Sequence, residues 1–291
     1  MADYVNPKEL VHEALQAADK KCRLSVRDML IRGMLSGAFL GYATSLVFVV
    51  NSQGLPPIVG AILFPVGFVI LVLLGLELVT GNFALLPAAL LNGRIPLSKA
   101  VRNLFWVYVA NLVGSVLYAA LFYLVLTNSG SSGSGAVGDL VKQVAQKKTL
   151  AYAALGASGW TTALVKGLLC NWMVTIGAVL SFVSRSTVGK ITAMWLPIMT
   201  FFALGFEHSV VNMFVVPSAM ILGASISIGQ WLFWNLLPVT LGNIVGGALF
   251  TGIALSMTYP REVTPEVQAP TAAMQTERQG NFVGVADAQP M

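Results

Sequence analysis

The sequence predicts an all-α membrane protein with six transmembrane helices in a 3+3 inverted repeat, in which helices two and five are broken. Of its 291 residues, 56% are hydrophobic and 10% are charged. The apolar residues form runs of about 18 to 28, which can cross the hydrocarbon core of a bilayer as helices. Four motifs of the first half also recur in the second half in the same order.

The six candidate spans use nearly all of the chain between two polar ends. At about 20 residues per span, they run from residues 33 to 50, 58 to 76, 100 to 126, 166 to 183, 191 to 204 and 229 to 254. We therefore predict an N-terminal segment 1–27, a six-span domain 28–258 and a tail 259–291. The tail is rich in Pro, Gln, Ala and Thr without apolar periodicity, so it is predicted to be a disordered cytoplasmic segment.

The N-terminal segment is predicted to form an amphipathic helix. Asn6, Pro7 and Glu9 occupy its N-cap, N1 and N3 positions. Its apolar residues at helical spacing are Leu10, Val11, Ala14, Leu15 and Ala18. Because this stripe leads directly into a span, we expect it to pack at the membrane surface or on a neighbouring subunit, with a soluble lead-in helix as the alternative. Between spans three and four, the run NSGSSGSG predicts a flexible linker, followed by a poorly ordered segment to about Trp160.

Basic residues flank the spans unevenly and predict the orientation. One side has Lys8, Lys20, Lys21, Arg23, Arg27, Arg32, Arg94, Lys99, Arg102, Arg185 and Lys190, whereas the other has Lys142, Lys147 and Lys148. Both termini are therefore expected in the cytoplasm, with the protein in the plasma membrane, the inner membrane of a bacterium. Such flanking charges also account for the net charge of +5 without nucleic acid as a partner. Cys22 and Cys170 indicate no disulfide framework.

The internal repeat has an offset of 130 to 134 residues. It aligns RGMLSGA with KGLLCNW, FPVGF with LPIMT, GLELVTGN with GFEHSVVN, and NLVGS with NIVGG. Three spans followed by three spans point in opposite directions through the bilayer, which makes the repeat inverted. Inverted repeats place a transport site at their interface, and broken helices at matching positions are its best sequence marker.

Each break is predicted from an apolar run that is too long for one span. We expect a non-helical loop around ELVTGN, supported by Gly81, and a second loop around EHS, each followed by a half-helix. Exposed backbone at that depth requires protein cover or an aqueous cavity. The N-terminus of a half-helix carries a partial positive charge, so a pore here would favour anions.

Glu77 and Glu207 occupy matching positions at the two breaks. An intramembrane carboxylate is costly, so each must have a role. We interpret both as structural carboxylates that accept backbone N–H hydrogen bonds and so hold the breaks open, with ion coordination as the alternative. The neighbouring residues differ between the two breaks, and we expect these residues, Thr80, His208 and Ser209, to carry the chemistry.

His208 is the only residue expected at the breaks that can exchange a proton near neutral pH. A packing histidine is the alternative. Asn171 and Asn212 are further polar groups inside the spans. Asn111 and its repeat counterpart Asn243 are expected to hold helices together.

The stretches ELVTGN, LLCNWMV, GFEHSVVNMFVVP and LLPVTLGN resemble the signatures of the formate/nitrite transporter family, over roughly residues 25 to 258. The resemblance implies an aquaporin-like fold, a pore in each protomer, a homopentamer, and small monovalent weak-acid anions as substrates. Mapped by residue, it implies a pathway of Thr80, Asn171, Glu207, His208 and Asn212. Leu78 and Val79 resemble part of a hydrophobic constriction.

Two positions depart from the family pattern. Leu155 stands where many members have a lysine, which Lys147, Lys148 or Lys166 could replace. Val79 stands where phenylalanine is common, which allows a wider constriction.

The sequence therefore predicts a channel or proton-coupled transporter for nitrite or formate, with nitrite placed first. Bicarbonate uptake within the same family and a neutral-solute channel are the alternatives, although the paired Asn-Pro-Ala loops of aquaporins are absent from the sequence. No pattern of an intramembrane enzyme, a metal site or a bound cofactor is found in the sequence. The expected partners are the substrate anion, protons, the lipid bilayer and further copies of the chain.

Overall fold

The computed structural model describes residues 3–259, and the regular elements in this range are all helices. The first repeat contains α1 (Pro7–Cys22), α2 (Val26–Ser52), α3 (Pro57–Leu63), α4 (Pro65–Leu73), α5 (Val79–Leu91) and α6 (Leu97–Leu126). The second contains α7 (Gly135–Lys148), α8 (Leu150–Ala154), α9 (Ala157–Leu180), α10 (Thr187–Ala203), α11 (Ser209–Ile221), α12 (Ile228–Trp231), η1 (Leu232–Leu236), α13 (Leu237–Gly247), η2 (Ala248–Ile253) and α14 (Ala254–Thr258). Apart from residue 259, the predicted tail lies outside the described residues.

Four helices in the described range are long and apolar enough to cross a membrane: α2, α6, α9 and the continuous helix from α12 to α14. The other apolar helices are shorter and come in two pairs, α3–α4 with α5, and α10 with α11. These pairs stand where the sequence predicts broken spans two and five. The predicted all-α class is confirmed.

The breaks are shorter than predicted, and the expected role of Gly81 is corrected. Gly75 and Gly205 end the preceding helices with φ of 63° and 66°. The next residue after each glycine closes a Schellman motif, since Leu76 N–H bonds Leu71 O at 2.9 Å. Only three residues are then non-helical before α5 and α11 begin. Gly81 lies in the first turn of α5 rather than in a loop, because Gly75 supplies the left-handed turn.

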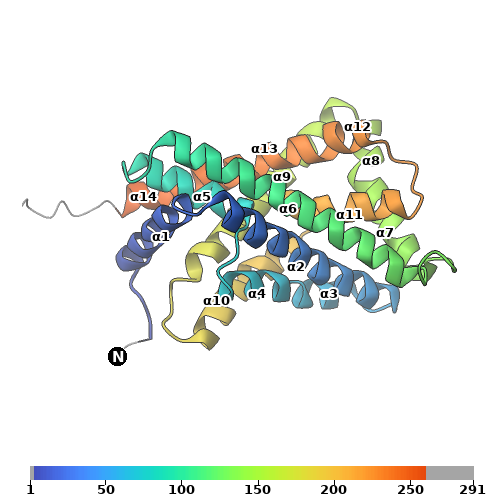
Figure 1. The fold of residues 1–291 in the computed structure, drawn as a ribbon, viewed down its shortest axis with the longest axis horizontal. Coiled ribbons are helices and arrows are strands. Elements are labelled where there is room, and N and C mark those ends of the chain that lie inside the picture. Colours follow the sequence, from blue (N-terminus) through green and yellow to red (C-terminus); the bar gives the residue numbers. More distant parts are fainter. Residues whose placement is uncertain (1–2, 260–291) are drawn as a thin grey trace, which may run out of the picture. The chain divides into compact units, whose positions relative to one another are not determined.

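The first and last spans of each repeat pack unusually closely. A Cβ on Gly114 of α6 would lie 1.9 Å from Met34 O of α2. Its repeat counterpart Gly246 in α13 would lie 2.1 Å from Leu168 O of α9. Small residues at these two positions therefore let the helix backbones touch, and the pairs α2 with α6 and α9 with α13 run side by side (Figure 1).

The N-terminal helix packs differently from the expectation of a membrane-surface or subunit contact. The five predicted apolar residues of α1 are buried, and their cluster includes Leu85, Leu86, Ala88 and Ala89 of α5 in the same chain. The predicted cap is present, since Asn6 Oδ1 accepts a hydrogen bond from Glu9 N–H at 3.0 Å. The apolar stripe is thus covered by the protein's own half-helix.

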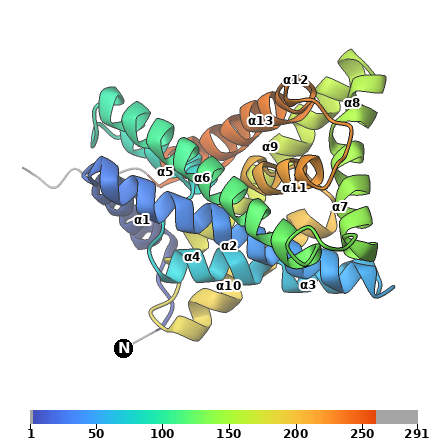
Figure 2. The same cartoon turned by 45° about the vertical axis from the view of Figure 1, so that its right-hand side comes forward.

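The segment after the Gly/Ser run was predicted to be poorly ordered, and the structure corrects this. Residues 135–148 form α7, whose Val141 and Ala145 are fully buried. In Figure 2, α7 lies beside α11, whereas α1 lies near α5 at the other end of the bundle. The apolar residues of α7 recur at helical spacing, but the glycines and serines just before them favoured the prediction of a poorly ordered segment. Helices α1 and α7 are equivalent, because each precedes the first long span of its repeat and packs on that repeat's half-helix.

Candidate functional site: two broken helices that meet at a histidine

The first break is built around the buried carboxylate of Glu77, which is 2% exposed. Lys21 Nζ from α1 lies 2.8 Å from Glu77 Oε1. Asn82 Nδ2 donates to Glu77 Oε2 at 3.0 Å. Asn111 of α6 fixes the backbone, since its Nδ2 donates to Glu77 O and Gly33 O while its Oδ1 accepts from Val79 N–H. Asn111 thus satisfies backbone groups that the break releases from helical hydrogen bonding. The expectation that the carboxylate accepts backbone N–H groups is corrected, because the partners of Glu77 are the Lys21 and Asn82 side chains.

The second break repeats this arrangement residue by residue. Glu207 is 2% exposed, and its Oε2 lies 2.8 Å from Lys148 Nζ of α7 and 2.8 Å from Asn212 Nδ2. Asn243 Nδ2 donates to Glu207 O and Gly167 O, and Asn243 Oδ1 accepts from Ser209 N–H. One donor has no equivalent at the first break: Tyr152 Oη donates to Glu207 Oε1 at 2.9 Å.

The two lysines were not predicted as site residues. Each is the last lysine of a KK pair at the end of an amphipathic helix, in ADKKC and AQKKT. The two KK pairs are 127 residues apart, close to the offset of the internal repeat. This spacing could have shown that the repeat includes α1 and α7. A buried carboxylate needs a cation or several donors. This requirement was a second available signal.

A further pair of asparagines holds the lysine-bearing helices and was also missed. Asn103 Nδ2 donates to Lys21 O at 3.1 Å, and Asn235 Nδ2 donates to Lys148 O at 2.9 Å. Both side chains are fully buried. Asn235 lies in the π-helical segment η1, whereas Asn103 lies in a regular α-helix. The same contact to a lysine backbone oxygen is thus made from a π-helical segment in one repeat and from a regular α-helix in the other.

The two repeats meet where His208 contacts Thr80. His208 Nε2 lies 3.1 Å from Thr80 Oγ1, and His208 Nδ1 accepts a hydrogen bond from Val211 N–H at 3.2 Å. Because Nδ1 accepts, this geometry corresponds to the neutral imidazole with its proton on Nε2, which donates to the Thr80 hydroxyl. The Thr80 hydroxyl then keeps its own proton for another acceptor. Both half-helices begin at this contact, so their positive dipole ends face each other.

Asn171 ties the centre together, while several polar atoms around it have no partner. Asn171 Nδ2 donates to Thr80 O at 3.1 Å and to Asn243 O at 2.6 Å. Among residues 3–259, no hydrogen-bond partner is found for the buried atoms Asn171 Oδ1, Asn212 Oδ1 and Ser209 Oγ. Asn171 and Asn212 therefore have a structural contact and a spare acceptor, and Ser209 has a spare hydroxyl.

A cavity opens on each side of the central contact. The first, of about 390 Å³, lies at the first break and reaches Leu78 and Glu77. The second, of about 190 Å³, lies at the second break and reaches His208 and Lys148. Phe68, Leu71 and Leu78 line the first cavity, and Phe201, Phe202 and Val211 line the second, so apolar walls adjoin the centre on both sides. Val79 is fully buried and borders neither cavity.

Lys148 is the basic residue that reaches the second break. Of the three lysines considered as replacements at Leu155, Lys148 is the one whose side chain contacts Glu207, whereas Lys166 accepts a hydrogen bond from Glu207 N–H through its backbone oxygen. Leu155 itself is 61% exposed. Within the described residues, no group of three or more His, Cys, Asp or Glu side chains is arranged to hold a metal ion.

Comparisons with known proteins agree with this geometry. The profile described as "Formate/nitrite transporter" matches residues 8–257. A "Probable formate transporter" from Methanothermobacter thermautotrophicus is 34% identical over 276 residues, which cover 90% of this chain and 99% of the relative. Among solved structures, an "FNT family ion channel" is similar with a TM-score of 0.74, 26% identity and coverage of 87% of this chain and 99% of the other. A "Pentameric formate channel with formate bound" gives a TM-score of 0.67, 26% identity and coverage of 81% and 98%.

The match includes both breaks, the central histidine and the helices that carry the two lysines, and it confirms the resemblance found in the motifs. The chain is an integral membrane protein of the formate/nitrite transporter family, whose members are channels and transporters of anions rather than enzymes.

Proposed function

We propose that this chain conducts formate across the membrane through a pore in each protomer of a homopentamer, with proton coupling at His208. Formate is placed before nitrite and bicarbonate because the named relative is a probable formate transporter and one solved neighbour is a pentameric channel with formate bound. The sequence-based preference for nitrite remains a prediction to test against formate.

The observation that carries the proposal is the hydrogen bond between His208 and Thr80. It joins the two half-helix N-termini between two cavities that have apolar walls. An anion enters more easily where helix dipoles and a hydroxyl proton face it. Crossing an apolar constriction as a bare anion is opposed by a large desolvation cost, whereas a neutral acid crosses far more readily.

The proton transfer follows from the tautomer. Formate accepts the Thr80 hydroxyl proton in a hydrogen bond, and His208 Nε2 donates to the same oxygen of Thr80. An external proton first converts His208 to the imidazolium by protonating Nδ1, which gives up its hydrogen bond from Val211 N–H. The Nε2 proton then passes to Thr80 Oγ1 as the Thr80 hydroxyl proton passes to formate, which leaves neutral imidazole and formic acid. Glu207, which is held by Lys148, Tyr152 and Asn212, stays an ion-paired acceptor beside the histidine and does not itself supply the proton.

The test is anion flux in proteoliposomes, with formate, nitrite, bicarbonate and chloride compared at equal concentration. We expect formate flux to be the largest and an inwardly directed proton gradient to accelerate it. Equal flux of all four anions would contradict a substrate-selective pore. Flux of nitrite well above that of formate would reassign the substrate and leave the pore in place.

Orientation and assembly are part of the proposal. The basic flanks favour cytoplasmic termini in a plasma membrane. A cysteine at Gly133, an open position, should react with an impermeant thiol reagent from outside intact cells, and a cysteine at exposed Thr187 only after permeabilisation. Native mass spectrometry in mild detergent should give five chains, and a stable dimer or trimer would contradict the pentamer.

A further inference from the structure

The cavities at the two breaks differ in the number of basic residues that line them, although each break has the same glutamate–lysine ion pair. The cavity of about 390 Å³ at the first break is lined by four basic residues, Lys20, Lys21, Arg32 and Lys190. Among the residues that line the cavity of about 190 Å³ at the second break, Lys148 is the one lysine or arginine. Each cavity borders a structural ion pair, so the difference lies in the additional cations of the first.

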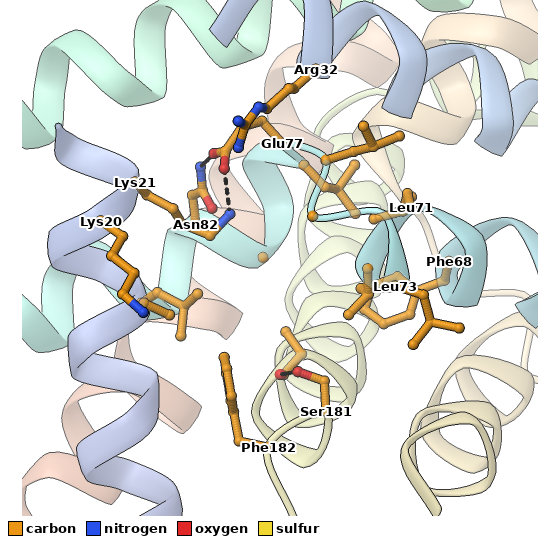
Figure 3. A pocket seen from close by; sticks show the side chains of 18 of the residues that line it. Lys20, Lys21, Arg32, Phe68, Leu71, Leu73, Glu77, Asn82, Ser181 and Phe182 are labelled. Carbon is orange, nitrogen blue, oxygen red and sulfur yellow. Dashed lines mark hydrogen bonds and ion pairs between the residues drawn. The ribbon is translucent and has the colours of Figure 1, made fainter. Parts of the chain in front are cut away.

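Three of the four basic residues in the first cavity take no part in the ion pair that holds the break. Lys21 pairs with Glu77, the one acidic residue among those that line the cavity. Within residues 3–259, no ion pair or side-chain hydrogen bond is found for Lys20, Arg32 or Lys190. They come from three separate elements, α1, α2 and α10. Figure 3 shows Lys20 and Lys21 reaching into the cavity from α1, Arg32 entering from α2 near Glu77, and Ser181 and Phe182 on another wall.

These three cations exceed what conduction requires. The same transported anion must also pass the second cavity, where the single lysine is already paired with Glu207. One paired lysine is therefore sufficient for entry from that side. The predicted orientation accounts for basic residues on this flank, but it does not require that three of them, from α1, α2 and α10, line one cavity.

The size and charge of the first cavity fit a larger and more highly charged anion. At about 30 Å³ per water molecule, the cavity volume greatly exceeds the space that formate needs. A phosphate group carries three strong acceptor oxygens and a charge of about −1.5 to −2 near neutral pH. Arginine and lysine side chains bind such groups through charge-assisted hydrogen bonds.

Such an anion cannot continue through the pore. Apolar Phe68, Leu71 and Leu78 line the cavity, and Leu78 directly precedes the half-helix at the central contact. The Born cost of removing an ion from water grows with the square of its charge, and a phosphate dianion loses far more solvation than a monovalent weak acid at the same place. Neutralising it would require two protons, whereas the centre offers one histidine.

We propose that the cavity at the first break is a binding site for a phosphate group, free or on a small metabolite, and that its occupation blocks anion conduction from that side. The blocking step rests on the proposed function, whereas the binding step does not. Lys20, Arg32 and Lys190 are the binding residues. The site would couple conduction to the phosphate content of the compartment that this mouth faces.

The binding step is tested on the purified, full-length protein in detergent by calorimetric titration with inorganic phosphate and with glucose 6-phosphate, at constant ionic strength set with chloride. We expect saturable binding that weakens at least tenfold in Lys20→Gln/Lys190→Gln. The matched control is Lys147→Gln, because Lys147 is the exposed repeat counterpart of Lys20 and lines neither cavity. Equal binding in the double variant, or no saturable binding in the wild-type protein, overturns the site.

Two further arms of the titration separate phosphate chemistry from charge and from source. Binding of the phosphate monoester should strengthen from pH 5.5 to 7.5, because its second pKa is about 6. Sulfate binding with equal affinity and no pH dependence would show a general polyanion site and would contradict the assignment to phosphate. A clear preference for glucose 6-phosphate over free phosphate would identify a metabolite as the source.

The blocking step is tested by formate flux in oriented proteoliposomes. Phosphate on the side of the first break should reduce flux in a saturable way, phosphate on the other side should not, and Lys20→Gln/Lys190→Gln should be less sensitive. Binding without any effect on flux overturns the block. If formate is not conducted at all, the proposed function fails, while the titration still decides whether the phosphate site exists.

Discussion

The two helix breaks have the same framework and different centres. At each break a buried glutamate pairs with a lysine, accepts from an asparagine five residues later, and has its backbone oxygen held by a second asparagine. The difference begins at the next three residues. In the repeat alignment, Leu78, Val79 and Thr80 correspond to His208, Ser209 and Val210. Repetition therefore identifies what holds the breaks, and departure from repetition identifies the candidate chemistry.

The helices that carry the two lysines are also held in place differently. Lys148 ends a helix that is connected on both sides to long spans, and Tyr152 shares its glutamate. Lys21 ends a helix that precedes the first span, and this helix is fastened at its start by Asp3 and Glu9, which bind Ser184 and Arg185. The first break therefore depends on a helix that joins a long span only at its C-terminal end, whereas the second depends on a helix that lies between two long spans.

The largest expected effect tests the difference between the centres. His208→Phe keeps the ring volume but removes the donor to Thr80, and we expect proton-driven formate uptake to fall by about 10² to 10⁴, the range for loss of a general acid–base group. Uptake under an imposed pH gradient in proteoliposomes measures it.

The matched variant is Leu78→His/His208→Leu, which moves the histidine to the repeat-equivalent position. Recovery of proton-driven uptake in this double variant would show that position within the repeat does not matter. Full activity of His208→Phe would make His208 a packing residue.

A smaller effect, on stability, tests whether the two acids are equivalent. Glu77→Gln and Glu207→Gln each leave a lysine without its partner in a buried place, and we expect each to cost about 3 to 5 kcal/mol. Thermal unfolding of the oligomer in detergent should show a lower midpoint for both variants. Normal stability together with altered anion preference would assign the acids to ion coordination instead.

Removal of the unpaired charge is the control for this experiment. Glu77→Gln/Lys21→Met and Glu207→Gln/Lys148→Met should regain part of the lost stability, because neither pair then leaves a lone buried cation. If the double variants are less stable than the single ones, the lysines have a structural role beyond the ion pairs.

Tyr152→Phe sharpens the comparison by making the second break resemble the first. The change removes a single hydrogen bond to a charged acceptor, so we expect a loss of about 1.5 to 3 kcal/mol. Its effect should disappear in the Glu207→Gln/Lys148→Met background, where the charged acceptor is gone. A loss of equal size in both backgrounds would show that Tyr152 acts through packing.

The smallest expected effect concerns the anchor found only at the first break. The Ser184 hydroxyl and the Ser186 N–H hold the pKa of exposed Asp3 below its ordinary value. A carboxylate with a lowered folded-state pKa stabilises at pH values above its ordinary pKa of about 4. This contribution is lost as pH falls through the lower folded-state value. Limited proteolysis should therefore release α1 more readily below about pH 4, and Asp3→Asn should reduce this pH dependence while the ion pairs of Arg185 with Glu9 and Glu13 stay in place. Unchanged release in acid would show that Arg185 and α5 hold the helix without Asp3.

Local sequence determined a large part of this protein. Apolar runs determined the membrane helices, because a helix buried in lipid must satisfy its backbone internally and present apolar side chains. Matching GLELVTGN and GFEHSVVN located both breaks, because a glutamate at that depth needs a compensating framework wherever it occurs. The sequence also predicted that the two breaks differ at His208, because its repeat counterpart is Leu78.

Tertiary structure alone decided which distant groups meet. Lys21 and Glu77 are 56 residues apart and Lys148 and Glu207 are 59 apart, and no local pattern specifies such a partner. Two amphipathic helices were predicted as a surface helix and a poorly ordered segment, because their apolar stripes do not reveal what covers them. The length of each break was likewise decided by Asn111 and Asn243, whose side chains bond Val79 and Ser209 across the bundle and set where the half-helices begin.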